Sequence, residues 1–213
     1  MINRIYSPLI NLISVDTVIK GTVTVVYTTG IWTSNAHGLS DGDVVLLSNG
    51  GGALPAGASA TTKYFVKIIN ANTFYLYTDS GLANILAVTD NGSGTNSFNL
   101  QCKVVNVQDY ENVQVDVDTT GNANFTLKCQ VSNEDTCPDF SAAQSTTNIW
   151  KYIQLKNLND GTSINGSDGI VPTGTDINTS YELNLNGARW LSFDFTAWVA
   201  GKVRLSVKGY GNV

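Results

Sequence analysis

The segment Phe125-Thr-Leu-Lys-Cys-Gln-Val131 alternates strictly between apolar and polar side chains. Successive side chains of a β-strand point to opposite faces of a sheet, so this segment places one row on a core and the other in water. The same alternation recurs in four further segments, at 113–117, 181–185, 191–195 and 203–207. Turn-forming residues separate the segments, at 120–122, 186–187 and 200–201. We therefore expect at least five short strands in an antiparallel, jelly-roll-like β-sandwich.

The first half of the chain is also β-rich, but longer loops divide it. Strands are expected at four places, which are 22–27, 43–47, 63–68 and 73–78. The last two should form a hairpin closed by Asn70-Ala-Asn72, and the glycine-rich run at 48–57 should be a loop. The best helical candidate is 81–88, where we expect one turn and no helix. This half is predicted to be a small β-barrel-like module.

A cluster of Gly, Ser and Asn at 90–96 predicts a domain boundary near residues 95–102. We divide the chain into an N-terminal strand or arm (1–19), the small β module (20–96) and the β-sandwich domain (97–213). The arm has an apolar pattern of its own, which suits pairing with the C-terminal sheet. In that case the module is inserted after the first strand, and otherwise it is appended. The sequence leaves both arrangements open.

Composition argues against several classes of partner. The chain has 213 residues, of which only 14% are charged, and its 12 basic and 17 acidic side chains give a net charge of −5. A surface that neutralises phosphates has no support in this balance, so we expect no nucleic-acid partner. No stretch approaches the roughly 20 apolar residues that cross a bilayer, and the N-terminus lacks a signal-peptide core, so we expect no membrane partner and a mature chain that starts at Met1.

Side chains that commonly carry chemistry are few. Cys102, Cys129 and Cys137 have neither zinc-ribbon nor disulfide-scaffold spacing, and we interpret them as buried thiols. The only histidine, His37, would have to be the general base of any triad, but no nucleophile motif accompanies it, and a structural turn is the favoured interpretation. The oxygen-rich run at 157–169 fails the EF-hand spacing and is expected to be a turn-rich loop. We predict no catalytic residue, cofactor or metal, and no enzyme.

Two of the four tryptophans are candidate contact residues. If the alternation of 191–195 continues, Leu191, Phe193, Phe195 and Ala197 face the core, and Trp190 and Trp198 lie on the opposite face. Two outward indole rings need cover, because large exposed aromatic side chains favour interfaces. The cover could be another protein chain, a sugar ring of a host glycan, or loops of the same domain.

Four motifs of the first half carry a family resemblance, namely His37-Gly-Leu-Ser-Asp-Gly-Asp43, Leu54-Pro-Ala-Gly57, Lys63-Tyr-Phe-Val66 and Asn72-Thr-Phe-Tyr-Leu76. Together they resemble a small β module that recurs in virion proteins of tailed bacteriophages. The module is also similar to the first catalytic-cysteine half-domain of ubiquitin-activating enzymes. That second resemblance implies no activity, because the adenylation and cysteine machinery has no counterpart in this chain.

The second half resembles a β-sandwich domain of phage structural proteins. Its motifs are Phe125-Thr-Leu-Lys128, Asp139-Phe-Ser-Ala-Ala143, Asn148-Ile-Trp150, Tyr152-Ile-Gln-Leu-Lys156, Asp168-Gly-Ile170, and Trp190 followed by Gly201-Lys-Val-Arg-Leu-Ser-Val207. The resemblance implies a non-enzymatic virion protein, assembled in the bacterial cytoplasm, that binds other virion proteins and forms a homo-oligomer in a symmetric particle. Head decoration, a neck or tail position and a fibre-base adaptor all fit. The alternative is a carbohydrate-binding adhesion module that contacts host glycan through Trp190 or Trp198.

Overall fold

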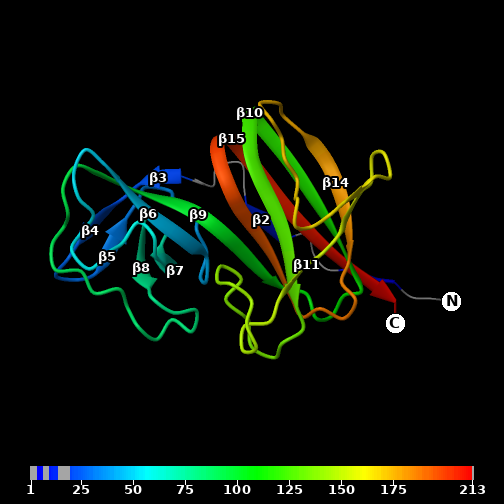
Figure 1. The fold of residues 1–213 in the computed structure, drawn as a ribbon, viewed down its shortest axis with the longest axis horizontal. Helices are drawn as coiled ribbons and strands as arrows, with labels where there is room; N and C mark the ends of the chain where they lie inside the picture. The colour runs from blue at the N-terminus through cyan, green and yellow to red at the C-terminus, as the bar shows by residue number, and fades with distance from the viewer. Residues whose placement is uncertain (1–3, 7–9, 14–19, 213) are drawn as a thin grey trace. The chain divides into compact units, whose positions relative to one another are not determined.

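The computed structural model describes residues 4–6, 10–13 and 20–212, and the side chains of residues 20–211 (Figure 1). All of the regular structure in this part of the chain is β-strand, and the strands pair antiparallel. The predicted all-β, antiparallel, sandwich-like fold is confirmed. Over these same residues, no helix is available that could cross a lipid bilayer.

The chain folds as two compact units that are interleaved in the sequence. The first unit contains Met1–Asp16 and Lys103–Val213, and the second contains Thr17–Cys102. The change from the second unit to the first occurs inside β9 (Thr95–Asn106). The glycine-containing cluster at 90–96 therefore ends where a strand begins, and the units divide a few residues later.

The first unit contains most of the strand residues. Its strands are β1 (Arg4–Tyr6), β2 (Ile10–Ile13), β10 (Asn112–Ser132), β11 (Lys151–Tyr152), β12 (Leu155–Asn157), β13 (Ser163–Ile164), β14 (Asn178–Asn184) and β15 (Trp190–Asn212). The order is β13-β12-β14-β10-β15, with β1 and β2 paired to β15 and β11 paired to β10. The N-terminal strands thus hydrogen-bond to the C-terminal strand.

The long strands β10 and β15 correct the predicted turns. Residues 120–122 and 200–201 do not reverse the chain, so the four segments expected as separate strands form only two. In the register, Thr120 is opposite Lys202 and Asn124 is opposite Ala200, which leaves 121–123 opposite Gly201. The turn formers of the two strands therefore meet side by side and bend the paired ribbon. Figure 1 shows both strands rising to this bend and descending from it.

The bend is the corner of the sandwich. Strands that pass from one layer of a sandwich to the other commonly do so at bulges, where extra residues increase the local twist. Gly121, Asn122 and Gly201 have φ angles of 84°, 58° and 94°, in the left-handed region that favours glycine and asparagine. The carboxylate of Asp176 accepts hydrogen bonds from the backbone N–H groups of Gly121 (3.1 Å) and Ala123 (3.2 Å), which holds the corner.

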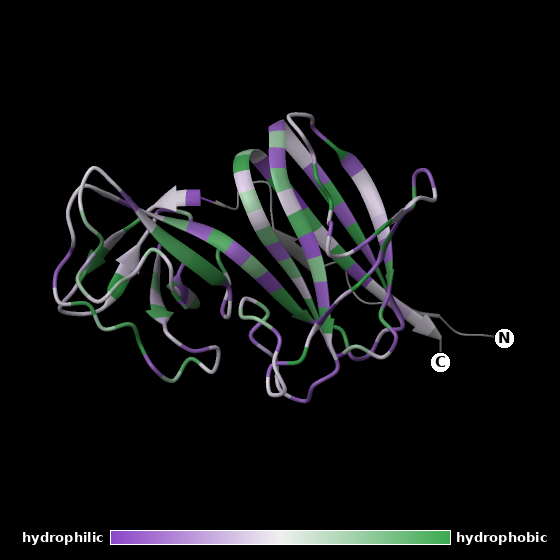
Figure 2. Ribbon diagram, viewed as in Figure 1, coloured by the Kyte–Doolittle hydropathy of each residue, from purple (hydrophilic) through white to green (hydrophobic). Residues whose placement is uncertain are grey.

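The core of the first unit lies between the inward rows of these strands. On each side of the bend β10 alternates buried apolar residues with half-exposed polar ones, and β14 continues the pattern. Figure 2 shows the alternation as bands of colour along β10. The inward residues include Val113, Val115, Val117, Phe125, Leu127, Cys129, Leu183, Phe193, Phe195, Val203 and Leu205. The period-2 pattern thus identified these core residues, although it placed the strand ends wrongly.

Hydrogen bonds of one side chain, that of Asn148, hold together the long connection between β10 and β11. The Asn148 side chain accepts a hydrogen bond from the Asp139 backbone N–H (2.9 Å) and donates to the carbonyls of Asp139 (2.9 Å) and Ala143 (3.1 Å). The indole N–H of buried Trp150 donates to Ala142 O (3.1 Å). These hydrogen bonds join the motif Asp139-Phe-Ser-Ala-Ala143 to the motif Asn148-Ile-Trp150. The two motifs are therefore the two halves of one loop.

The second unit is a smaller antiparallel sheet. Its strands are β3 (Lys20–Thr22), β4 (Thr24–Val26), β5 (Ile31–Thr33), β6 (Val44–Gly50), β7 (Lys63–Asn70), β8 (Thr73–Tyr77) and the first part of β9. They follow the order β9-β6-β7-β8-β5-β4, with β3 paired to β9. The predicted hairpin at 63–78 is present as β7 and β8, and the predicted strand at 22–27 is divided between β3 and β4.

The centre of the second unit is aromatic. Trp32, Phe74 and Phe98 are fully buried, and the rings of Phe74 and Phe98 meet edge to face with centroids 6.1 Å apart. Trp32 on β5 pairs with Phe74 on β8, which joins the two strands through their largest side chains. Leu76 and Val66 fill the same interior. The unit therefore has a core of its own.

Carboxylates in the turns of the second unit should make it sensitive to acid. Backbone N–H groups of Ala83 and Asn84 hold the pKa of Asp79 below its usual value, and those of Ala56 and Gly92 do the same for Asp90. A pKa that is lower in the folded chain adds stability above the unfolded pKa of about 4, and this stability is lost as the pH falls through the folded pKa. We expect the D79N/D90N double variant to lose less stability than the wild type between pH 6 and pH 2.5 in urea unfolding. Parallel pH curves for the two proteins would contradict this.

Candidate functional site

The geometry of His37 is that of a structural residue. Its side chain is 1% exposed, and Nδ1 accepts a hydrogen bond from the Leu39 backbone N–H (3.0 Å). The proton therefore lies on Nε2, which donates to Asn70 O (3.1 Å). The ring also meets Phe74 edge to face, with centroids 5.0 Å apart. The favoured interpretation, a turn that is fixed by its polar side chains, agrees with this geometry.

The first part of the oxygen-rich run at 157–169, residues 157–162, closes the hairpin of β12 and β13. Asn157 N–H donates to Thr162 O (2.8 Å), and Gly161 N–H donates back to Asn157 O (2.9 Å). The Asp160 carboxylate accepts from the backbone N–H (2.9 Å) and hydroxyl (2.7 Å) of Thr162. Across the described residues, no group of three or more His, Cys, Asp or Glu side chains is arranged to hold a metal. The oxygens of this run close a turn.

None of the three cysteines forms a disulfide, and the expectation that all three are buried holds for Cys102 and Cys129 but not for Cys137, which is half-buried. Burial raises the pKa of Cys129, and burial with the nearby Asp139 charge raises the pKa of Cys137 to about 11. At pH 8 only about one Cys137 in a thousand would be the reactive thiolate. We therefore expect slow alkylation by iodoacetamide in the folded chain and rapid alkylation of all three cysteines in denaturant, as measured by mass spectrometry. Labelling of folded Cys137 at the rate of a free thiol would contradict this.

The two candidate tryptophans are half-buried, and the predicted face of Trp198 is wrong. In the register, Leu127 is opposite Phe195 and Thr126 is opposite Ala197, so Thr196 is an extra residue that forms a β-bulge. The bulge shifts the alternation by one, which exposes Ala197 and turns Trp198 to the side of Phe195.

Both indole rings have partners within the chain. Trp198 stacks on buried Phe125, with ring centroids 5.1 Å apart and planes within 6°. Trp190 lies at the start of β15, and its indole N–H donates to Glu134 O (3.0 Å). The two residues belong to separate contacts, and the structure does not bring them together into one site. A role for either in binding a protein or a glycan stays a prediction.

The stacking of Trp198 on Phe125 predicts that removal of the Trp198 ring lowers the stability of the fold. We expect Trp198→Ala to lower the free energy of unfolding by about 2 kcal/mol, less than a fully buried aromatic because the ring is half-exposed. Trp198→Phe should retain most of the stability, because a smaller ring can still stack on Phe125. Urea unfolding of the three proteins measures the effect. Equal stability of Trp198→Ala and the wild type would show that the stack contributes nothing.

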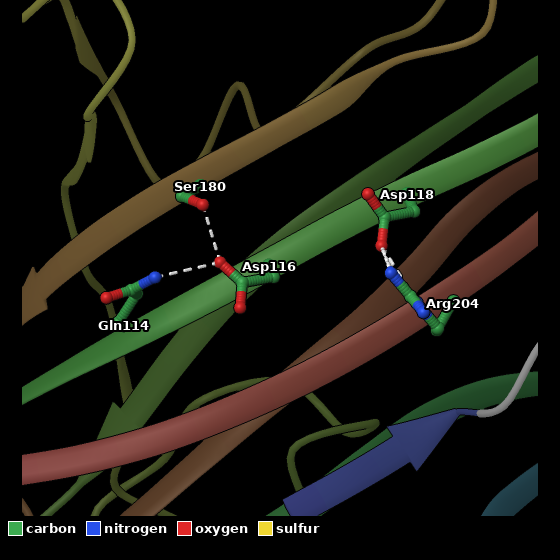
Figure 3. Close-up of polar contacts among 5 residues, drawn as sticks. All are labelled: Gln114, Asp116, Asp118, Ser180 and Arg204. Atoms are coloured by element: carbon green, nitrogen blue, oxygen red, sulfur yellow. Dashed lines mark hydrogen bonds and ion pairs between the residues drawn. The ribbon is translucent and has the colours of Figure 1, made fainter. Parts of the chain in front are cut away.

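Polar side chains on one outer face of the first unit bind one another. Figure 3 shows Asp116 on β10 accepting hydrogen bonds from Gln114 (3.0 Å) and from the hydroxyl of Ser180 on β14 (2.5 Å). Beside them, both Nε (2.8 Å) and Nη2 of Arg204 contact one oxygen of Asp118. Exposed pairs of this kind contribute at most about 1 kcal/mol. This face has the character of a solvated sheet surface.

A groove lies next to the short strand β11. Its volume is about 390 Å3, and its lining comes from the end of β10, the segment around β11 and the turn that precedes β15. The lining residues are Val131, Ser132, Asn133, Ile149, Trp150, Lys151, Tyr152, Ile153, Gln154, Leu185, Asn186 and Ala188. Apolar side chains and amides predominate, and Lys151 is the one charged residue among those that line it.

Tyr152 is the most accessible aromatic residue of the groove. It is 37% exposed, its ring meets Trp150 edge to face, and Lys128 Nζ lies 5.5 Å from the ring centroid. Sequence reasoning recognised 148–150 and 152–156 as parts of a family pattern but did not assign them a surface. A two-residue strand has too few residues for its alternation to be read, so the groove could not be foreseen.

Comparisons with known proteins identify distant structural similarities only. No family model and no curated protein matches the chain. The SPBc2 prophage-derived protein YomS is similar with a TM-score of 0.36 and 10% identity, over 51% of this chain and 78% of that one. The PBSX exported protein XepA is similar with a TM-score of 0.37 and 7% identity, over 98% of this chain and 82% of that one.

A third similar structure is the K1 cleaved adhesin domain of Lys-gingipain from Porphyromonas gingivalis W83. Its TM-score is 0.22 at 11% identity, over 98% of this chain and 95% of that one. Similarity at this distance assigns neither a family nor an activity. The resemblance to ubiquitin-activating enzymes stays a prediction.

Proposed function

We propose that this chain is a non-enzymatic structural protein of a tailed-bacteriophage virion, and that it acts by binding other virion proteins. One observation carries the proposal. Three of the four motifs by which the first half resembles phage virion modules, at 37–43, 63–66 and 72–76, are joined to one another in the second unit. The turn that begins at His37 donates from His37 N–H to Ala71 O (3.2 Å) and from Nε2 to Asn70 O, so it is fastened to the β7–β8 hairpin that contains the two strand motifs.

The hydrogen-bond partners of the polar side chains support a binding function for this chain more than a catalytic one. His37, Asp79, Asp90, Asn148 and Asp176 each bond to backbone groups of their own unit, and in doing so they close a turn, a loop or a corner. These hydrogen bonds stabilise the loops of the two β units, so each unit presents a fixed surface that another protein can bind. Such a protein works through buried interface area, and copies repeated by symmetry multiply weak contacts. We propose a homo-oligomer within a symmetric particle, on the head, neck, tail or fibre base.

Mass spectrometry of purified particles tests this proposal. Particles of the phage or prophage that encodes the chain should contain it in a fixed ratio to the major virion proteins after density-gradient purification. Absence from the particles, with the chain abundant in the same lysate, would overturn the proposal. A host glycan at Trp190 or Trp198 remains the alternative from the sequence, but the structure offers no observation that favours it, because both rings contact the chain itself.

A further inference from the structure

One edge of β11 faces away from β10, and no other strand of the described residues pairs with it. In the pairing with β10, Tyr152 is opposite Gln130 and Ile153 N–H donates to Cys129 O (3.1 Å). Backbone groups alternate in direction along a strand, so the N–H and C=O of Tyr152 point away from β10. Among the described residues, β10 is the one strand that pairs with β11, so no second strand bonds to these groups. An unpaired edge of this kind is a template for another strand.

The groove, which both residues of β11 help to line, suits an apolar side chain. Ile153, Leu185 and Ala188 are buried residues that reach its surface, and Ile149 at its margin is 38% exposed. A strand added to an exposed edge gains affinity from main-chain hydrogen bonds and specificity from pockets that accept alternate side chains. The edge and the groove together present both of these components.

Charge restricts the sequence of the added strand. No Asp or Glu lines the groove, although acidic residues outnumber basic ones in the whole chain. Lys151 is exposed at the rim, and the ammonium of Lys128 lies over the Tyr152 ring. Neither ammonium forms an ion pair with a carboxylate of the described chain. A second copy of this chain would bring its own Lys151 to the edge, and lysine at an edge opposes pairing between like copies.

We infer that the free edge of β11 and its groove bind an extended, acidic peptide segment of another protein. The segment adds a strand through the Tyr152 N–H and C=O, places an apolar side chain in the groove and sets a carboxylate against Lys151. The inference rests on the proposed function, since it names the kind of partner surface that a virion-assembly protein would use. It concerns one site, so it can fail while the proposed function stands.

Selection from a random library of short displayed peptides tests the inference with the full chain as bait. Enriched peptides should alternate apolar and other residues and should carry Asp or Glu. A synthetic copy of one enriched peptide should slow hydrogen exchange of the Tyr152 amide, because that N–H becomes hydrogen-bonded. Failure to enrich any peptide, enrichment of peptides without acidic residues, or unchanged exchange at Tyr152 would each overturn the inference.

Variants separate the backbone contact from the side-chain contacts. Tyr152→Pro removes the outward N–H together with the ring and should weaken peptide binding by about tenfold or more. Tyr152→Val also removes the ring but keeps the N–H, so it should bind more tightly than the proline variant, and the difference between the two variants measures the backbone contact. Lys151→Glu should also weaken binding, and its matched control is Lys202→Glu at the bend, with the same change of charge outside the groove. Equal binding by Lys151→Glu and Lys202→Glu would overturn the role of charge, even if Tyr152→Pro fails to fold.

Two other occupants of the site would give different results. Dimerisation of the chain at rising concentration that Tyr152→Pro abolishes would identify a second copy as the occupant and overturn the acidic-peptide inference. Displacement of the peptide by a neutral oligosaccharide would overturn it in favour of a glycan. If the chain is present in purified particles but none of these binding results is obtained, the inference fails and the proposed function remains.

Discussion

Replacing Gly201 with alanine should cost about 3 kcal/mol or more of the folding stability of the first unit. Gly201 has a φ of +94°, and a Cβ built on it would lie 2.6 Å from Ala123 Cα and 3.1 Å from Ala123 N. The left-handed backbone alone disfavours alanine by about 1–2 kcal/mol. The remaining cost comes from the clash, because β10 must move away at the position where Asp176 holds it. Urea unfolding followed by circular dichroism measures the loss.

Gly187→Ala is the matched control for the corner. Gly187 has a φ of +80°, and no heavy atom lies within 4 Å of the position where its Cβ would be. The substitution therefore carries the backbone penalty without the clash, and we expect a cost of about 1 kcal/mol. The difference between the two variants isolates the close approach of β10 and β15. If both variants lose the same stability, the strands are not in contact at the bend.

Replacing His37 with alanine should destabilise the second unit by about 3 kcal/mol. The change leaves the buried Leu39 N–H without its partner, which costs about 1–3 kcal/mol, and it takes the Nε2 donor away from the Asn70 carbonyl. It also opens a cavity against Phe74, which His37 contacts edge to face. Urea unfolding that is monitored by tryptophan fluorescence measures the effect, because Trp32 is buried in the same unit.

His37→Gln provides the test of mechanism. Glutamine has a carbonyl that can accept and an amide that can donate, so it should recover part of the stability that alanine loses. A histidine kept for general-base chemistry would instead tolerate alanine with little loss of stability. Wild-type stability in His37→Ala would therefore contradict the structural role and would reopen the search for a catalytic function.

The sequence predicted the class of fold because alternation is a local property. Phe125, Leu127 and Cys129 all lie on the core face, as their spacing requires, and the hairpin closed by 70–72 is present. Strand ends were less predictable. Gly121 and Gly201 are predicted to form turns because glycine readily adopts a positive φ. Whether such a residue reverses a strand or bends it depends on the residues opposite it in the sheet. That information is not local.

The candidate contact residues show the same limit. A regular alternation that continues past Phe195 predicts an outward Trp198, and one extra residue at Thr196 makes this prediction wrong. A bulge of this type has no sequence signal in Phe195-Thr-Ala-Trp198, since none of its residues is a turn former. The edge at Tyr152 was equally invisible, because an unpaired backbone group is defined by the absence of a neighbour. Only the pairing of strands can show it.

The corner at Gly201 also has a consequence for how the first unit comes apart. β10 and β15 run through both layers of the sandwich, so the two layers share their central strands. Neither layer can therefore unfold while the other stays intact. Mechanical load applied to one layer is passed along continuous backbone into the other. The first unit should therefore unfold in one cooperative transition, without gradual loss of strands from its edges.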